Sequence, residues 1–291
     1  GSDQPMKKCR SMKLVRGTAL GLFAAVCGGL TAGAADFPQG LMLHFNFDEN
    51  ESAGRITDRT GRGNNGQFLG AKWVQGGKSG GAAEFAPAGG SIRVAHSPSL
   101  NPTQATFAAW FKLAPSDSTG RSIFDKSAGL GYALFIQCDP AQAAERGRLR
   151  VSVKGSACGS DAAVTDGSWH FGAATMDGSV LKLYVDGMLQ KQSAPCAGNI
   201  PSSTNDLFIG MNRPTGDPAA SSPSLHGLLD ELMIFDRALS EAEVKTVMAS
   251  AKPRFTEAEV KRRKAELKEL LERGLILREF HDRKLKELET Q

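Results

Sequence analysis

Hydrophobic and polar residues alternate with a period of two from residue 40 to about residue 236. Leu41, Leu43 and Phe45 take every second position at the start of this region, which is typical of a strand with one buried face. Similar runs predict further strands at 91–95, 106–113, 132–137, 149–153, 169–176, 180–185, 206–211 and 228–235. No helical pattern interrupts these runs.

Asp-Gly dipeptides punctuate the strands at Asp166, Asp177 and Asp186. The second and third join neighbouring strands at two-residue distance, which predicts type I′ hairpins with glycine supplying a positive φ. Many short strands without intervening helices predict an all-β fold with two antiparallel sheets face to face.

Six motifs occur in order along this region. They are Asp48-Glu49 with Asp58–Gly66, Phe107–Phe111, Asp166–His170, Leu183–Gly187, Ile209-Gly210 and Gly227–Ser240. Together they resemble a laminin-G-like domain of the concanavalin A-like lectin/glucanase superfamily. The resemblance implies a two-sheet antiparallel jelly roll over residues 36–251 and a secreted binding module, without naming a ligand.

Within this region Trp110 and Trp169 lie in apolar runs and are expected to be core residues. Ser240 and Glu243 form a capping box that predicts a short helix ending near Ala251.

Residues 1–35 have the pattern of a signal peptide. Residues 1–5, before Met6, are interpreted as a cloning remnant or as the result of a start codon assigned too far upstream. A basic start precedes an apolar stretch and an A-x-A exit at 32–34, with cleavage expected before Ala35. We therefore expect a secreted or periplasmic protein, with a retained membrane anchor as the alternative. No later apolar run approaches the roughly 18 residues that span a bilayer.

The leader also accounts for the formal charge of +4, because its five basic residues face Asp3 alone. The rest of the chain is formally neutral. This balance argues against nucleic acid as a partner.

Three cysteines remain once the leader is removed, which allows one disulfide and one free thiol. Cys158 and Cys196 both lie in Gly/Ser/Ala-rich segments, where backbones can approach closely, so this pairing is favoured over those with Cys138. No Cys/His spacing supports zinc.

The tail from 252 to 291 is about half charged, with residues of both signs. A capping box at Thr256 opens a helix, Gly274 ends it, and a second apolar stripe follows, so a helical hairpin is predicted. It resembles the short C-terminal (SHOCT-like) hairpins of bacterial proteins, although Leu277 stands where a capping Thr or Ser is common. Such a hairpin has too little core for independent stability, so docking or self-association is expected, with a solvated hairpin as the alternative.

Catalytic signatures are missing from the sequence. Glucanases of this fold use carboxylates two and four residues apart on one strand, and no such string occurs. Asp230 and Glu231 are neighbours, which would point them to opposite faces of a strand. A nucleophile elbow is absent and the five histidines are scattered, so we expect no enzyme activity.

A structural calcium ion is the one cofactor that the sequence suggests. The oxygen-rich loop with Asp58 and Asn64 offers calcium ligands. Asp230 takes alternate positions with Leu228, Leu232 and Ile234, so its side chain is expected to point inward, where a carboxylate needs a partner. First and last strands are often neighbours in jelly rolls, which could join these residues. Alternatively, Asp230 accepts backbone N–H bonds from the same loop without metal.

Two functions follow from these patterns. The first is a non-catalytic module that binds carbohydrate or an extracellular protein surface. The alternative is a structural envelope or adhesion protein whose helical tail mediates protein interaction or oligomerisation.

Overall fold

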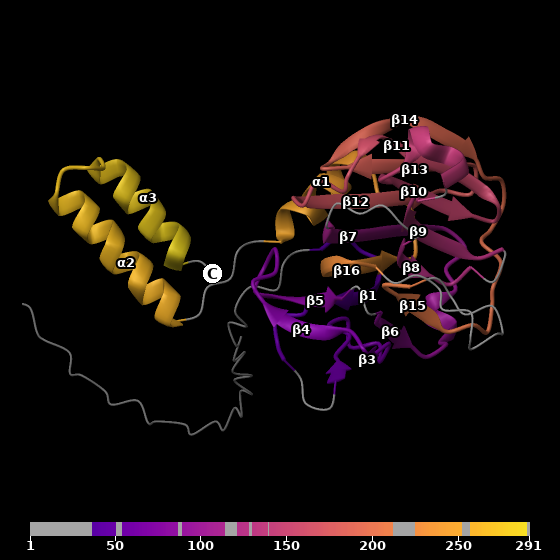
Figure 1. The fold of residues 1–291 in the computed structure, drawn as a ribbon, viewed down its shortest axis with the longest axis horizontal. Coiled ribbons are helices and arrows are strands. Elements are labelled where there is room, and N and C mark those ends of the chain that lie inside the picture. The colour runs from indigo at the N-terminus through magenta and orange to yellow at the C-terminus, as the bar shows by residue number, and fades with distance from the viewer. Residues whose placement is uncertain are drawn as a thin grey trace, which may run out of the picture. The chain divides into compact units, whose positions relative to one another are not determined.

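Two antiparallel sheets packed face to face form the body of the molecule, as the alternating pattern predicts (Figure 1). The computed structural model describes residues 37–50, 54–86, 89–113, 121–127, 130–138, 140–211, 225–251 and 257–289. The predicted leader lies outside these residues, as does Thr256 of the second capping box. An all-β sandwich followed by helices is confirmed.

The first sheet, sheet A, has the order β14-β13-β12-β7-β16-β5-β4, with β1 as a further strand beside β16. Its strands are β1 (Leu41–Phe45), β4 (Lys72–Gln75), β5 (Gly81–Phe85), β7 (Ala105–Leu113), β12 (Trp169–Met176), β13 (Val180–Val185), β14 (Met188–Pro195) and β16 (Gly227–Phe235).

The second sheet, sheet B, has the order β11-β10-β9-β8-β15-β6-β3-β2. Its strands are β2 (Arg55–Ile56), β3 (Gly66–Leu69), β6 (Ser91–Val94), β8 (Arg121–Asp125), β9 (Tyr132–Ile136), β10 (Arg148–Val153), β11 (Ser156–Ala163) and β15 (Leu207–Ile209). Two short 3-10 segments, Pro98–Leu100 and Pro140–Glu145, lie in the connections.

Strand β16 is the centre of sheet A, because it pairs with three other strands. One edge pairs with β7 along most of its length. The other edge is shared: residues up to Leu229 pair with β5, and residues from Leu232 onward pair with β1. The first and last strands are therefore neighbours, as expected for a jelly roll.

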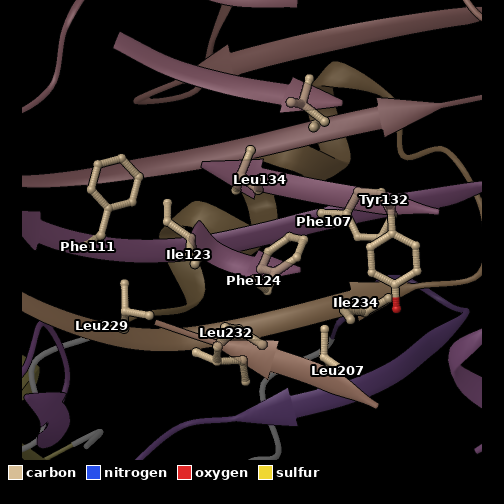
Figure 2. Packing of buried hydrophobic residues seen from close by; sticks show 14 of the residues in the cluster. Phe107, Phe111, Ile123, Phe124, Tyr132, Leu134, Leu207, Leu229, Leu232 and Ile234 are labelled. Carbon is tan, nitrogen blue, oxygen red and sulfur yellow. The ribbon is translucent and has the colours of Figure 1, made fainter. Parts of the chain in front are cut away.

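The core between the sheets is rich in aromatic rings. The rings of Phe107 and Tyr132 stack with centroids 4.5 Å apart, and Phe124 lies 5.4 Å from Phe107 (Figure 2). The Tyr132 hydroxyl donates to the Leu100 carbonyl oxygen at 3.1 Å, and burial raises its pKa above the ordinary range. Packing of these rings gives the core a defined geometry, and the hydroxyl keeps a partner.

A second feature of the interior is the ammonium group of Lys126, which is fully buried. It donates to the carbonyl oxygens of Ser203 and Asn205 at 3.2 and 2.8 Å and to the Ser203 hydroxyl at 3.1 Å. A buried charge is tolerable only when it is hydrogen-bonded in this way. Lys126 thereby fixes the segment before β15 to the end of β8.

The hairpin between β13 and β14 has the predicted two-residue turn. Asp186 and Gly187 have φ values of 50° and 77°, as a type I′ turn requires. The turn predicted at Asp177 is different, because three residues, 177–179, separate β12 from β13 and the Asp177 N–H bonds to the Val180 oxygen at 3.4 Å. The two-residue prediction is wrong there, because the Asp177 carboxylate caps a longer loop with bonds to its N–H groups.

Helix α1 (Glu241–Ser250) begins where the capping box predicts. The Ser240 hydroxyl accepts from the Glu243 N–H and the Glu243 carboxylate accepts from the Ser240 N–H. Val244 and Val247 are buried against the face of sheet A that points away from sheet B, which we call the outer face. Trp110 is buried on this face rather than between the sheets, and Trp169 packs there partly exposed.

The tail contains two helices, α2 (Glu257–Glu272) and α3 (Arg278–Glu289), which contact each other. Gly274, with φ of 66°, follows the first helix as predicted. None of the described side chains in either helix is buried, and Leu275, Leu277 and Phe280 are exposed. Among the described residues no helix is both long and apolar enough to cross a membrane.

Truncation after Ala251 should leave the melting temperature within about 2 °C of that of the full chain, because the described tail buries no side chain. In contrast, Val247→Ala should destabilise the full chain by about 2 kcal/mol, since it removes two buried methyl groups. Thermal unfolding followed by circular dichroism measures both. A larger loss for the truncation than for Val247→Ala would show that the tail stabilises the sandwich.

Candidate functional site

A β-bulge in the middle of β16 places the two acidic residues that the sequence singled out. The register with β7 shifts between Asp230 and Met233, and Glu231 has φ of 47°. Asp230 lies opposite Trp110 of β7, so its side chain is on the outer face and not between the sheets. The prediction that the Asp230 side chain points inward is wrong, because the bulge interrupts the alternation of side chains along the strand.

Asp230 is completely buried on the outer face, beneath the loop that joins β4 to β5. Its carboxylate accepts from the N–H groups of Ser79 and Glu231 at 2.9 and 2.7 Å. Desolvation, followed by the charges of Glu231 and Asp48, raises its pKa to about 9 against the lowering effect of those two bonds. The carboxyl group is therefore neutral at physiological pH.

Glu231 is also buried, and its Oε2 lies 2.6 Å from Nε2 of His44. His44 is opposite Met233 in the register, which places this pair on the outer face as well. The expectation that Asp230 and Glu231 point to opposite faces is therefore wrong, again because of the bulge. Neither carboxylate is exposed, so neither can act on a substrate from the surface.

Asp58 organises the loop that was predicted to hold calcium. Its oxygens accept from the N–H groups of His44, Thr60 and Asn64 at 3.2, 3.0 and 3.1 Å and from the Thr60 hydroxyl. Asn64 is similarly engaged: its amide donates to Met42 and its oxygen accepts from Ser99.

The three predicted calcium ligands already have hydrogen-bond partners. Asp58 and Asn64 use their oxygens to fix the 58–65 loop, whereas Asp230 bonds to the loop containing Ser79. The geometry therefore does not fit a single calcium site made by all three residues. The N–H groups that reach Asp230 belong to Ser79 and Glu231 and not to the 58–65 loop, and calcium binding stays a prediction.

The two cysteines predicted to pair lie where the edges of the two sheets meet. Cys158 is in β11, the edge strand of sheet B, and Cys196 follows β14, the edge strand of sheet A. Gly159 N–H donates to the Gln192 side chain at 3.0 Å, so the two edges are joined through side chains. Both cysteines are buried free thiols here, as is Cys138, and their pairing stays a prediction. Burial raises the pKa of Cys158 to about 11, which keeps this thiol unreactive.

One end of the outer face carries a transverse row of side chains that share the same register. Leu228 lies opposite Glu84 on one side and Lys112 on the other, and Lys112 lies opposite Trp169. Lys72 extends the row beyond Glu84. Five adjacent strands at the usual spacing make this row about 19 Å long.

A cavity of about 470 Å³ opens along this row. It is lined by Glu84, Phe85, Ala86, Lys112, Gly167, His226, Gly227 and Leu228. Gly227 is required there: its φ is 145°, and a Cβ would meet the Lys112 carbonyl oxygen at 2.2 Å. The volume falls within the range of small-molecule sites in proteins.

The polar groups of the cavity are available to a ligand. Glu84 and Lys112 are exposed, and within the described part of the chain no ion pair or side-chain hydrogen bond engages them or His226. Helix α1 covers a different part of the outer face, near Ala108 and Tyr184. Sequence reasoning missed this site because the strand pairing that aligns Glu84 with Lys112 is not visible in either segment alone.

Solved structures share the sandwich fold of this chain. Domain 4 of AbnA, a GH43 extracellular arabinanase from Geobacillus stearothermophilus studied in complex with arabinotriose, is 20% identical, covers 73% of this chain and 98% of its own, and has a TM-score of 0.56. The binding domain of Paraclostridial Mosquitocidal Protein 1 is 16% identical, with 72% and 52% covered and a TM-score of 0.56. Botulinum neurotoxin type C, whose cell entry depends on interaction with two ganglioside molecules, is 13% identical, with 73% and 51% covered and a TM-score of 0.55. The chain spans about half the length of these toxin domains, and at such identities the likeness shows the fold.

No curated protein sequence gives a significant match. The family described as the concanavalin A-like lectin/glucanases superfamily matches residues 87–245, which is more than half of the chain and includes most of both sheets and the start of α1. The chain therefore belongs to the concanavalin A-like lectin/glucanases superfamily.

Proposed function

We propose that the sandwich is a non-catalytic glycan-binding module and that a saccharide binds in the cavity along the Glu84–Lys112 row. The observation that carries this proposal is the combination of free polar groups with an apolar floor. Glu84, Lys112 and His226 offer acceptors and donors for hydroxyl groups, while Leu228 offers an apolar contact. Trp169, next in the row, adds an aromatic ring at the margin.

The same cavity argues against hydrolysis. Glycosidases generally place two carboxyl groups about 5 to 10 Å apart across the scissile bond. Glu84 is the one carboxylate among the described residues that line the cavity. The proposed role is therefore recognition without cleavage.

The structural relatives support a saccharide ligand. The arabinanase domain was studied with arabinotriose, and the type C toxin interacts with gangliosides. Neither ligand is assigned to this chain by fold alone, so both serve as probes.

Binding to a glycan array, arabinotriose and a ganglioside headgroup tests the proposal with residues 36–291 and with residues 36–251. We expect Lys112→Ala and Trp169→Ala each to weaken saccharide binding about tenfold, since each removes a contact of about 1.4 kcal/mol. Lys191→Ala is the matched control, because Lys191 is an exposed lysine on β14, away from the row. Equal binding by all three variants would exclude this cavity as the site.

A second function rests on the tail. Leu275 and Leu277 are exposed in the turn between α2 and α3, and Phe280 is exposed in the first turn of α3. This patch supports the alternative of an envelope or adhesion protein whose hairpin engages a partner protein or another copy. Saccharide binding that survives truncation after Ala251 favours the glycan module. The alternative is favoured if the protein binds no saccharide and if truncation abolishes self-association or partner capture.

A secreted or periplasmic location is part of the proposal, and the cysteines give its chemical test. Peptide mapping of exported protein under non-reducing conditions should show a Cys158–Cys196 peptide and an unpaired Cys138. The pairing is supported by the bonds that join neighbouring residues of the two segments, Ser156 to Pro195 and Gly159 to Gln192. A disulfide that includes Cys138 would contradict the assignment.

Asp230 predicts how stability depends on pH. Its pKa of about 9 in the folded state is far above its ordinary value of 3.8, so between these values the folded state holds a proton that the unfolded state has lost. The contribution to the free energy of unfolding is therefore complete below pH 4 and declines as the pH rises towards 9. Urea denaturation at pH 5 and pH 8 in the presence of a chelator should show this decline, and Asp230→Asn should reduce it.

Bound calcium would have the opposite effect on the pH dependence of the free energy of unfolding. A cation at Asp230 would stabilise the ionised carboxylate and remove the decline when calcium replaces the chelator. Identical curves with calcium and with chelator would leave calcium without support.

A further inference from the structure

His170 lies between two carboxylates, next to the proposed binding cavity. Its Nδ1 is 2.8 Å from Oδ2 of Asp186 and its Nε2 is 3.1 Å from Oδ1 of Asp166. A neutral imidazole has a single N–H, and an ionised carboxylate can only accept. Both contacts are therefore hydrogen bonds only when His170 is an imidazolium.

The two carboxylates belong to different parts of the structure. Asp186 is fixed to the sheet, because its Oδ1 accepts from the Phe171 N–H at 2.8 Å. Asp166 belongs to the turn before β12, where its Oδ1 accepts from the Ser168 N–H at 2.8 Å. The ring of His170 thus ties this turn to the sheet.

The turn in question forms one side of the cavity. Gly167 lines the cavity, and its N–H donates to the Leu113 oxygen at the end of β7 at 3.1 Å. Two residues later, Trp169 takes its place beside Lys112 in the row. A change in the position of the 166–169 turn would therefore change the shape of the proposed site.

The charges around His170 favour the protonated ring. Burial, the largest single effect, lowers its pKa, but the hydrogen bonds and charges of Asp186 and Asp166 together raise it above the ordinary value. On β7 the neighbouring group is the uncharged ring of Phe111, with centroids 6.2 Å apart. Near the Asp186 turn, Lys245 of α1 is paired with Glu241 at 2.6 Å, which limits its effect on the imidazole.

We propose that His170 is a positioning residue for the glycan site: its imidazolium holds the 166–169 turn in the binding geometry, and loss of the proton releases that turn. The inference rests on the proposed function. Once neutral, the ring has one N–H for two acceptors, and the bond to Asp166 is the one that is lost. That bond is the longer of the two, and the Asp166 side chain is 59% exposed against 47% for Asp186, so water replaces it more easily.

The test measures binding and protonation on the full chain. The affinity for arabinotriose, or for the array saccharide that binds best, is determined by calorimetry at pH 6 and pH 9, and the pKa of His170 is followed by NMR. Weakening of about five- to tenfold at pH 9 is expected, in the range of ordinary coupling between two sites. Reciprocity then requires saturating saccharide to raise the pKa of His170.

Asp186→Asn separates positioning from a purely structural role. The amide oxygen can still accept from Phe171, while the amide N–H₂ donates to Nδ1 of a neutral ring, so that Nε2–H reaches Asp166 without proton uptake. Asparagine also tolerates the left-handed backbone at this position, where φ is 50°. We expect the pKa of His170 to fall and the difference in affinity between pH 6 and pH 9 to disappear.

His226 lines the cavity and provides the control. If His226→Gln removes the pH dependence and Asp186→Asn leaves it intact, the proposal is overturned. A saccharide that binds equally well at both pH values overturns it as well. Absence of binding at every pH would reject the proposed function and with it the role of His170 in binding. The hydrogen bond between His170 and Asp166 would then be followed by hydrogen exchange of the Ser168 amide, which should accelerate as His170 loses its proton.

Discussion

The pairing of β16 with β7 is the interaction on which the rest of the molecule depends. These strands are about 120 residues apart in sequence, yet their register aligns the core residues of sheet A with the rings that stack between the sheets. The same register places Lys112 beside Leu228, and Leu228 beside Glu84. Closing so long a loop costs conformational entropy before any contact compensates, so this pairing is expected to form late and to limit the folding rate.

The bulge in β16 adapts this central strand to two different neighbours. Before it, the strand pairs with β5, and after it with β1. The bulge also places Asp230 and Glu231 on the outer face, where both side chains are buried and burial raises the pKa of Asp230. An apolar pair would satisfy the packing, but the carboxyl groups hold the backbone N–H of Ser79 and the ring of His44. The polar groups thus fix the loop and the first strand to the centre of the sheet.

The pattern of apolar residues in the sequence predicted the long central strands but failed at several other strands. β7, β12 and β16 are long, apolar and central, and their ranges were found within a residue or two. The apolar pattern did not reveal β11, and it indicated β14 only through the hairpin turn before it, because both are edge strands whose polar and small side chains give no alternation. β5 was missed for a related reason, since alanine and glycine dominate it where neighbouring elements approach closely. The candidate site was harder still, because Glu84, Lys112 and His226 come from separate segments and are brought together only by register.

The neighbouring position of β1 and β16 has a mechanical consequence. Leu41, at the start of β1, pairs with Phe235, at the end of β16, and Phe37 and Ala251 pack in one cluster on the outer face. The chain therefore enters and leaves the sandwich at the same end of one antiparallel pair. A force applied to both ends would open this pair one hydrogen bond at a time, like a zipper, instead of loading all its bonds together in shear. Adjacent ends also suit a domain for insertion into a loop of a larger protein, where its two connections span a short distance.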